Sequence, residues 1–183
     1  MDDRNYCYLS YAIDPLNEEN SPSLFLSING KNKPVSLKEL SEVNLTIVTY
    51  DFWWLVPAFK RKKHPLPSSI VDISQVAKLL TGRSHREYND DLPWSIWKLL
   101  AKYSKSANKQ IPIKDIIYQR NLTDHIERAH AMDMINKWQM ELWSELQMQL
   151  IEKGEKRRYF EVEKPIAKIL YDRQYHGICV NRK

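Results

Sequence analysis

Residues 45–74, LTIVTYDFWWLVPAFKRKKHPLPSSIVDIS, contain two transitions from a strand to a helix, and an aspartate stands at each one. The uncharged run over residues 45–49 predicts a buried strand that stops before Asp51, and apolar residues at helical spacing follow it. A second predicted strand, residues 69–73, carries Asp72 into another helix. Because open α/β sheets place their sites at the carboxyl ends of strands, both aspartates are candidate site residues. Each could equally well only cap the helix that follows it.

Composition sets broad limits on the class of protein. The chain has 183 residues, 43% of them hydrophobic and 28% charged, which fits one compact globular domain with an added helical piece. The net charge of +5 is compatible with a nucleic-acid partner without establishing one. The longest apolar run, residues 52–59, is too short to span a bilayer, and the polar start shows no secretory signal. Cys7 and Cys179 lack metal-binding spacing, so we expect reduced thiols, a cytoplasmic location and no membrane partner.

The N-terminal quarter predicts antiparallel strands. Residues 6–13 and 23–29 have strand composition and are separated by a proline-containing turn. A second turn over residues 30–33 leads to a short edge strand at residues 34–36, and a brief helix over residues 37–43 follows. With the two later strands, these elements predict an α/β fold.

The rest of the chain is mostly helical in pattern. The longest predicted helix begins at Asn121 or Thr123, ends near Lys153, and has an apolar stripe at spacings of three and four residues that we expect in the core. The stripe consists of Ala131, Ile135, Trp138, Leu142, Leu146 and Leu150. The other predicted helices cover residues 52–63, 74–81 with Gly82 as C-cap, 92–103, 112–119 and 162–176, and residues 105–110 form a basic linker.

Two groups of side chains have both a structural and a binding interpretation. The first predicted helix of the opening stretch ends in Lys60, Arg61, Lys62 and Lys63. Cations there suit the helix dipole, but they could also bind the phosphates of DNA. Tryptophans at helical spacing are typical of a core, whereas exposed ones could stack on bases. The candidates for stacking are Trp53, Trp54, Trp94 and Trp97.

The order of these elements, together with particular residues, resembles the 3′-5′ exonuclease domain of family A DNA polymerases. The similarity spans nearly the whole chain, and its order and spacing are more specific than any single motif. The stretches that carry it are 8–28, resembling the opening hairpin; 45–51, resembling the second exonuclease motif with its Tyr-Asp end; 71–73, resembling the following strand; 128–143, resembling the third-motif helix; and 163–181, resembling the helix and Gly-Ile-x-Val-Asn turn that begin the polymerase region.

The resemblance implies a ribonuclease H-like exonuclease fold, with a mixed sheet, flanking helices and a helical C-terminal extension. Residues 1–158 would form the exonuclease-like domain, and residues 159–183 would begin the polymerase region. The parent protein would be a DNA-directed DNA polymerase, a nucleotidyltransferase of DNA replication or repair. The expected partners are DNA and the polymerase region of the same or a partner chain.

The site residues that the resemblance implies are mostly replaced. Two-metal hydrolysis needs several carboxylates around two divalent ions, and the family provides an Asp-x-Glu pair on its first strand. In this chain Ser10 and Ala12 stand at that pair, and only Asp51 and Asp133 keep acidic side chains. The usual asparagine and tyrosine are replaced by Ile47 and Ala129, and Tyr50 and Asp72 lie near the same positions. We therefore expect a vestigial site without exonuclease activity, metal or cofactor.

Two other functions remain open from the sequence. An active nuclease with unusual ligands would use Mg²⁺ or Mn²⁺, although sliding the first strand to make Asp14 the leading ligand brings Leu16 to the second position. Alternatively, the scaffold could be a protein interaction module that docks through the apolar face of residues 162–170 and does not touch DNA.

Overall fold

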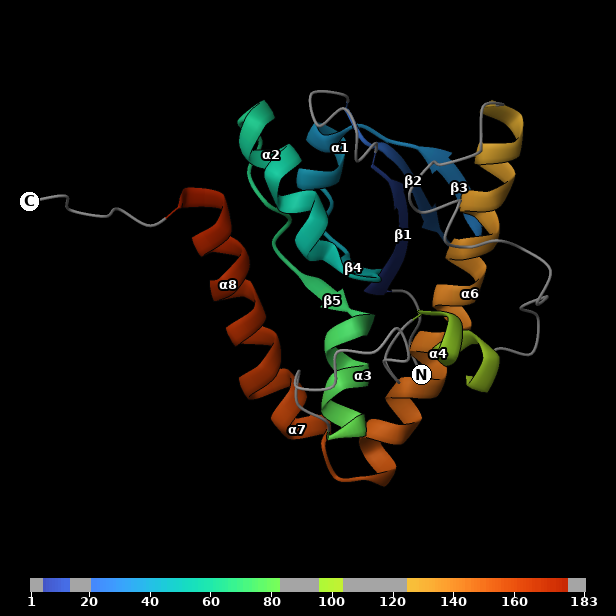
Figure 1. Ribbon diagram of the computed structural model, residues 1–183, viewed down its shortest axis with the longest axis vertical. Coiled ribbons are helices and arrows are strands. Elements are labelled where there is room, and N and C mark those ends of the chain that lie inside the picture. Colours follow the sequence, from blue (N-terminus) through green and yellow to red (C-terminus); the bar gives the residue numbers. More distant parts are fainter. Residues whose placement is uncertain (1–4, 14–20, 83–95, 104–124, 178–183) are drawn as a thin grey trace, which may run out of the picture.

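The computed structural model describes residues 5–13, 21–82, 96–103 and 125–177 (Figure 1). Several predicted features lie outside the described residues, so they stay predictions. These are the turn after the first strand, the linker and short helix over residues 105–119, the capping of the longest helix, Trp94, the side chain of Trp97, and Cys179.

Five strands form one mixed sheet in the order β3-β2-β1-β4-β5. Strand β1 (Tyr6–Ala12) pairs antiparallel with β2 (Ser23–Ile28) and parallel with β4 (Thr46–Thr49). Strand β3 (Lys31–Pro34) pairs antiparallel with β2, and β5 (Ile70–Asp72) pairs parallel with β4. The predicted α/β fold and the four longer predicted strands are therefore confirmed.

The hairpin between β2 and β3 differs from the prediction. Residues 30–33 were predicted as the turn, but β3 begins at Lys31 and the turn is formed by Asn29 and Gly30. Both residues have positive φ, 50° and 74°. Asn-Gly is the preferred pair for a two-residue hairpin turn that needs positive φ at both positions, so the strand resumes immediately after Gly30.

Helices cover both faces of the sheet (Figure 1). One face carries α3 (Ile73–Thr81), α4 (Ile96–Tyr103) and α6 (His125–Glu152), with α6 lying against β1, β2 and β4. The other face carries α1 (Leu37–Ser41), α2 (Val56–Lys62) and α8 (Lys164–His176), with α8 packed on α2. None of the helices in the described part of the chain is long and apolar enough to cross a membrane.

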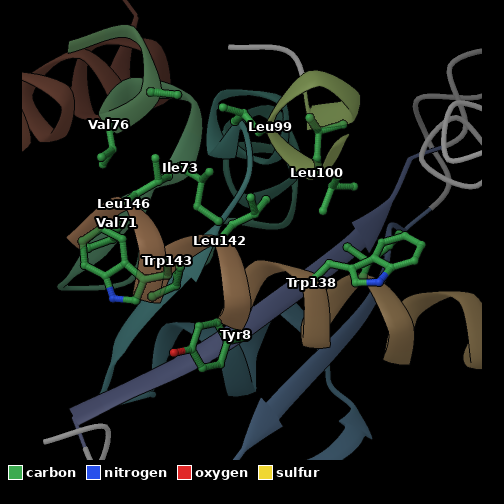
Figure 2. Close-up of a cluster of buried hydrophobic side chains, with 14 of the residues drawn as sticks. Tyr8, Val71, Ile73, Val76, Leu99, Leu100, Trp138, Leu142, Trp143 and Leu146 are labelled. Atoms are coloured by element: carbon green, nitrogen blue, oxygen red, sulfur yellow. The ribbon is translucent and has the colours of Figure 1, made fainter. Parts of the chain in front are cut away.

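The core under α6 confirms the predicted apolar stripe. All six stripe residues are buried, and Trp138, Leu142 and Leu146 pack with Tyr8 and Val71 of the sheet (Figure 2). Trp143, beside the stripe, is also fully buried and meets Tyr6 edge to face, with ring centroids 5.7 Å apart. These contacts fix the long helix across the sheet.

The helices of the other layer are interrupted where single helices were predicted. The predicted helix over residues 52–63 is a 3₁₀ turn, η2 (Phe52–Leu55), followed by α2. Pro57 stands in the first turn of α2, where its missing N–H costs no helical hydrogen bond, so a new helix begins there. The chain reaches α8 through α7 (Lys156–Arg158) and a π-helical turn, η3 (Tyr159–Glu163). The domain boundary at residue 158 stays a prediction.

Candidate functional site at the carboxyl edge of the sheet

Strands β1, β4 and β5 run in the same direction, so their carboxyl ends meet at one edge of the sheet. Ala12, Thr49 and Asp72 are the last residues of these strands. The sequence places Asp51 just beyond β4, so this edge collects most of the predicted site residues. What they can do depends on where each side chain points.

Asp72 is a buried carboxylate with all of its hydrogen-bonding capacity used. Its side chain is 3% exposed and accepts five hydrogen bonds. The donors are the backbone N–H groups of Asp51, Phe52 and Ser74 (each 2.9 Å), the Ser74 hydroxyl (2.8 Å) and the Tyr171 phenol (2.8 Å). A carboxylate offers about four lone-pair positions, so none is left for a metal ion. Asp72 caps α3 through Ser74, as the structural interpretation predicted, and also fixes the turn after β4.

Asp51 does not cap the following turn. Its backbone is left-handed, with φ 60° and ψ 54°, because its own N–H and that of Phe52 both point at Asp72. Its carbonyl accepts a 2.6 Å hydrogen bond from the Tyr11 phenol, and its carboxylate accepts one of 3.0 Å from the Trp54 indole. Burial, and then the negative charge of Asp72, raise the pKa of the Asp51 carboxyl to about 6, against a weaker opposing effect of Lys78.

Ser10 and Ala12 face α6 and are buried. The Ser10 hydroxyl donates a 2.9 Å hydrogen bond to the carbonyl of Met132, and Ala12 has no exposed surface. Two further side chains of α6 hold the sheet nearby: the Gln139 amide donates to the Leu9 carbonyl (2.9 Å) and the Asn136 amide donates to the Phe25 carbonyl (3.0 Å). Helix and strand are thus joined by polar contacts where the resemblance implies a metal site.

Asp133 lies toward the β3 edge of the sheet. Its carboxylate accepts a hydrogen bond from the Asn32 amide and pairs with Lys137 at 2.7 Å. Asn32 belongs to β3, three strand spacings from β4, which corresponds to about 14 Å. Asp133 is therefore held toward the β3 edge while Asp51 lies beyond β4, so the two carboxylates do not converge on one pair of metal ions, which would lie about 4 Å apart.

The other predicted site residues also pack against the body of the protein. Ile47 is buried on the α2 side of the sheet, opposite to the face of Ser10. Tyr50 is half-buried against the α6 core, and Ala129 is half-buried on α6. Among the residues that the structure describes, no group of three or more His, Cys, Asp or Glu side chains could hold a metal ion.

The cationic candidates Lys60, Arg61, Lys62 and Lys63 are exposed at the end of α2. Lys63 ends the helix in a left-handed conformation, φ 56°, and the Lys60 ammonium lies beside Gly177, which follows α8. Trp53 is 39% and Trp54 59% exposed, so the expectation that tryptophans are core residues is wrong for this pair. It is right for Trp138 and Trp143.

The sequence interpretation missed the residues that connect the elements. Tyr171 and Tyr11 support the Asp72 and Asp51 turns, and Asn136 and Gln139 join α6 to the strands. Only the last two left a signal, because they are polar residues adjoining the apolar stripe of the long helix. Neither a protein-family model nor a curated protein shows a significant match to this chain. Functional assignment therefore depends on the residues and their geometry.

Proposed function

We propose that this chain is a catalytically inactive 3′-5′ exonuclease-like domain of a family A type DNA polymerase. Its role would be structural, in DNA replication or repair in the cytoplasm, supporting the polymerase region and holding DNA through basic side chains. The mixed sheet flanked by helices is compatible with the ribonuclease H-like fold that the sequence resemblance implies. No nucleotide transfer is proposed for these residues alone.

The single observation that carries the proposal is the environment of Ser10. Its hydroxyl, at a position where the resemblance calls for a metal-binding carboxylate, donates to the carbonyl of Met132 at 2.9 Å. A carboxylate there would meet a carbonyl oxygen, because both groups can only accept hydrogen bonds. The residue type that stands at this position therefore joins α6 to β1 and leaves no anionic ligand.

Without the Asp-x-Glu pair, too little negative charge is left to hold the two metal ions that phosphodiester hydrolysis needs. Two dications about 4 Å apart repel each other strongly, and carboxylates shared between them offset that repulsion. Here Asp72 is saturated with hydrogen bonds and Asp133 is engaged by Asn32 and Lys137. Asp51 alone cannot hold two ions and activate a water molecule between them.

A cleavage assay tests this proposal. Purified chain is incubated with a 5′-labelled single-stranded oligonucleotide in Mg²⁺ and, separately, in Mn²⁺, and the products are separated on a denaturing gel. We expect no shortening above that given by the Asp51→Ala/Asp133→Ala double variant purified in the same way. Metal-dependent shortening by the wild type that the double variant loses would show an active nuclease with unusual ligands.

A second function is favoured by the outer side of α8. Ile166, Ile169 and Leu170 of α8 continue a side that begins with Val162 of the preceding η3, at spacings of three and four residues, and each is more than 40% exposed. Ala167, Tyr171 and Tyr175, on the inner side, pack on the body of the protein. A helix that is apolar on two opposite sides is typical of one packed between two layers. We propose the polymerase region, in the same or a partner chain, as the second layer.

The salt dependence of DNA affinity distinguishes a DNA-binding role from a purely protein-docking role. A pure interaction module should show negligible DNA affinity at moderate salt, unchanged when Lys60, Arg61, Lys62 and Lys63 are neutralised. A domain that holds DNA through these cations should instead lose affinity as salt rises, because each neutralised phosphate releases counterions.

A further inference from the structure

The exposed surface of η2 and α2 combines aromatic and cationic side chains on one side. Trp53, Pro57 and Lys60 are spaced by four and three residues, and so lie on one side of the helical segment. Trp54 precedes Pro57 by three residues and Arg61 follows it by four, so both lie beside this side of the helical segment. Both tryptophans and all four cations are exposed, so indole rings lie near the start of this surface and positive charge at its end.

Each of the two indoles is oriented by a contact with a neighbouring side chain and stays partly exposed. The Trp54 N–H donates to the Asp51 carboxylate at 3.0 Å, which orients the ring without covering it. The Trp53 ring packs against Tyr171 with centroids 6.4 Å apart and an interplanar angle of 48°. An oriented, partly exposed indole loses little conformational freedom on binding, which favours stacking with a planar ligand.

The positive charge exceeds what the helix ends require. Helices α2 and α8 run in the same direction, because the earlier residues Trp53 and Tyr171 are in contact and the later residues Lys60 and Gly177 lie side by side (Figure 1). Each helix C-terminus carries about half a negative charge, so the two ends together offset about one cation. Lys60, Lys62 and Lys63 alone carry three positive charges, so an excess remains.

We infer that this surface, Trp53 and Trp54 with the cations Lys60 to Lys63, binds single-stranded nucleic acid. Unpaired bases would stack on the indoles, and the backbone phosphates would lie against the lysines. The seven helical steps from Trp54 to Arg61 span about 10 Å, which is the length of about three stacked nucleotides at 3.4 Å each. The inference rests on the proposed function only in taking DNA as the partner. Its surface is separate from the vestigial residues Ser10 and Ala12, which are buried under α6.

Fluorescence anisotropy with a labelled oligothymidylate of about ten nucleotides tests the inference. EDTA in the buffer prevents cleavage. We expect Trp54→Ala to weaken binding about tenfold, since stacking on one aromatic side chain is worth about 1–3 kcal/mol. Trp54→Phe should restore most of the affinity, because it keeps an aromatic face but cannot donate to Asp51. Met148→Ala, another exposed apolar side chain, is the matched control.

The phosphate contacts are tested separately, through the salt dependence of the binding affinity. Lys60→Gln/Lys63→Gln, a pair of lysines three residues apart that includes Lys60 of this surface, should lower the slope of log affinity against log salt by about 1.4, at about 0.7 per phosphate contact on a single strand. Lys31→Gln/Lys33→Gln removes the same charge from exposed residues of β3 and should leave the slope unchanged. Duplex DNA should not respond to Trp54→Ala, because its base faces are already stacked.

Three results would overturn the inference: no saturable binding of the single strand at low salt, equal affinity of wild type and Trp54→Ala, or equal slopes for the two lysine pairs. None of them bears on the proposed loss of exonuclease activity, which the cleavage assay measures. Conversely, cleavage of the oligonucleotide in Mn²⁺ would contradict the proposed function and leave this binding result intact.

Discussion

The phenol of Tyr171 donates a 2.8 Å hydrogen bond to Asp72, a residue 99 positions earlier in the chain. This bond ties α8 to the carboxyl end of β5. The same helix is held at its start by Lys164, whose ammonium donates to the Ser69 hydroxyl at 2.9 Å, and the Tyr171 ring meets Phe52 edge to face at 5.3 Å. Helix α8 is therefore packed into the apolar core on the α2 side of the sheet and is not a loose extension.

Removing the Tyr171 hydroxyl should destabilise the protein. Tyr171→Phe leaves a buried carboxylate oxygen of Asp72 with one donor fewer, which costs about 1.5–3 kcal/mol for a hydrogen bond to a charged group. Urea unfolding followed by circular dichroism measures the change. Tyr175→Phe, one turn further along α8, is the matched control and should change the free energy of unfolding much less. Equal effects of the two variants would contradict the importance given to this bond.

Restoring the acidic residue at position 10 should harm the fold without restoring a metal site. In Ser10→Asp a buried carboxylate faces the carbonyl of Met132, so we expect a loss of at least about 3 kcal/mol in the free energy of unfolding. Ser10→Ala, which only removes the hydrogen bond, should cost about 1 kcal/mol. Thermal unfolding with and without Mn²⁺ checks both values. Stabilisation of Ser10→Asp by Mn²⁺ would show that the geometry still accepts a metal.

The Asp51 carboxyl should make stability depend on pH. Its pKa is raised from 3.8 to about 6 in the folded protein, so ionising it penalises the folded state. The wild type should therefore lose stability as pH rises from about 4 to about 6, by on the order of 3 kcal/mol, since the pKa rises from 3.8 to about 6 and one pKa unit is worth about 1.4 kcal/mol. Asp51→Asn cannot ionise and should escape this loss. Asparagine also tolerates the left-handed backbone at this position, which adds a contribution that does not depend on pH.

Urea unfolding of both proteins across this pH range gives the comparison. The advantage of Asp51→Asn over the wild type should grow between pH 4 and pH 6 and then stay constant. An advantage that is constant over the whole range would mean that the carboxyl titrates alike in the folded and unfolded chain.

Two isoleucines allow a buried apolar helix face to be compared with an exposed one. Ile135 of α6 is 3% exposed, so Ile135→Ala should cost about 2–5 kcal/mol through lost burial and a cavity. Ile169 on the outer side of α8 is 58% exposed, and Ile169→Ala should change stability by no more than about 0.5 kcal/mol. Chemical unfolding of the two variants under one set of conditions measures both. A large loss for Ile169→Ala would mean that this side is already buried, for example against a second copy of the chain.

Local patterns predicted the elements well because each depends on nearby residues. The β-branched run before Tyr50 is a strand, and the spacing of Trp138, Leu142 and Leu146 is that of a buried helix face. The hairpin differs from the prediction because Asn29 and Gly30 complete the turn in two residues, so β3 begins at Lys31. Propensity alone therefore located the elements but not the position of this turn or the division of residues 52–62 into η2 and α2.

The site could not be predicted in the same way, because its contacts join distant parts of the chain. The Ser10 to Met132 bond spans 122 positions, and the partner of Asp133 is Asn32, 101 positions away. Residue spacing does not show which strand a helix side chain faces, so Asp51 and Asp133 could be aligned with a motif without being near each other. The exposure of Trp54 likewise depends on which side of η2 the layers leave open.

Manganese binding tests the central claim most directly. Electron paramagnetic resonance measures free Mn²⁺ in a titration of the wild-type chain, with Asp51→Ala/Asp133→Ala as the reference. Because Ser10 and Ala12 provide no anionic ligand and Asp72 is saturated, we predict that the two proteins leave the same free-ion signal at every concentration. Tight binding of two ions by the wild type that the double variant loses would contradict the account.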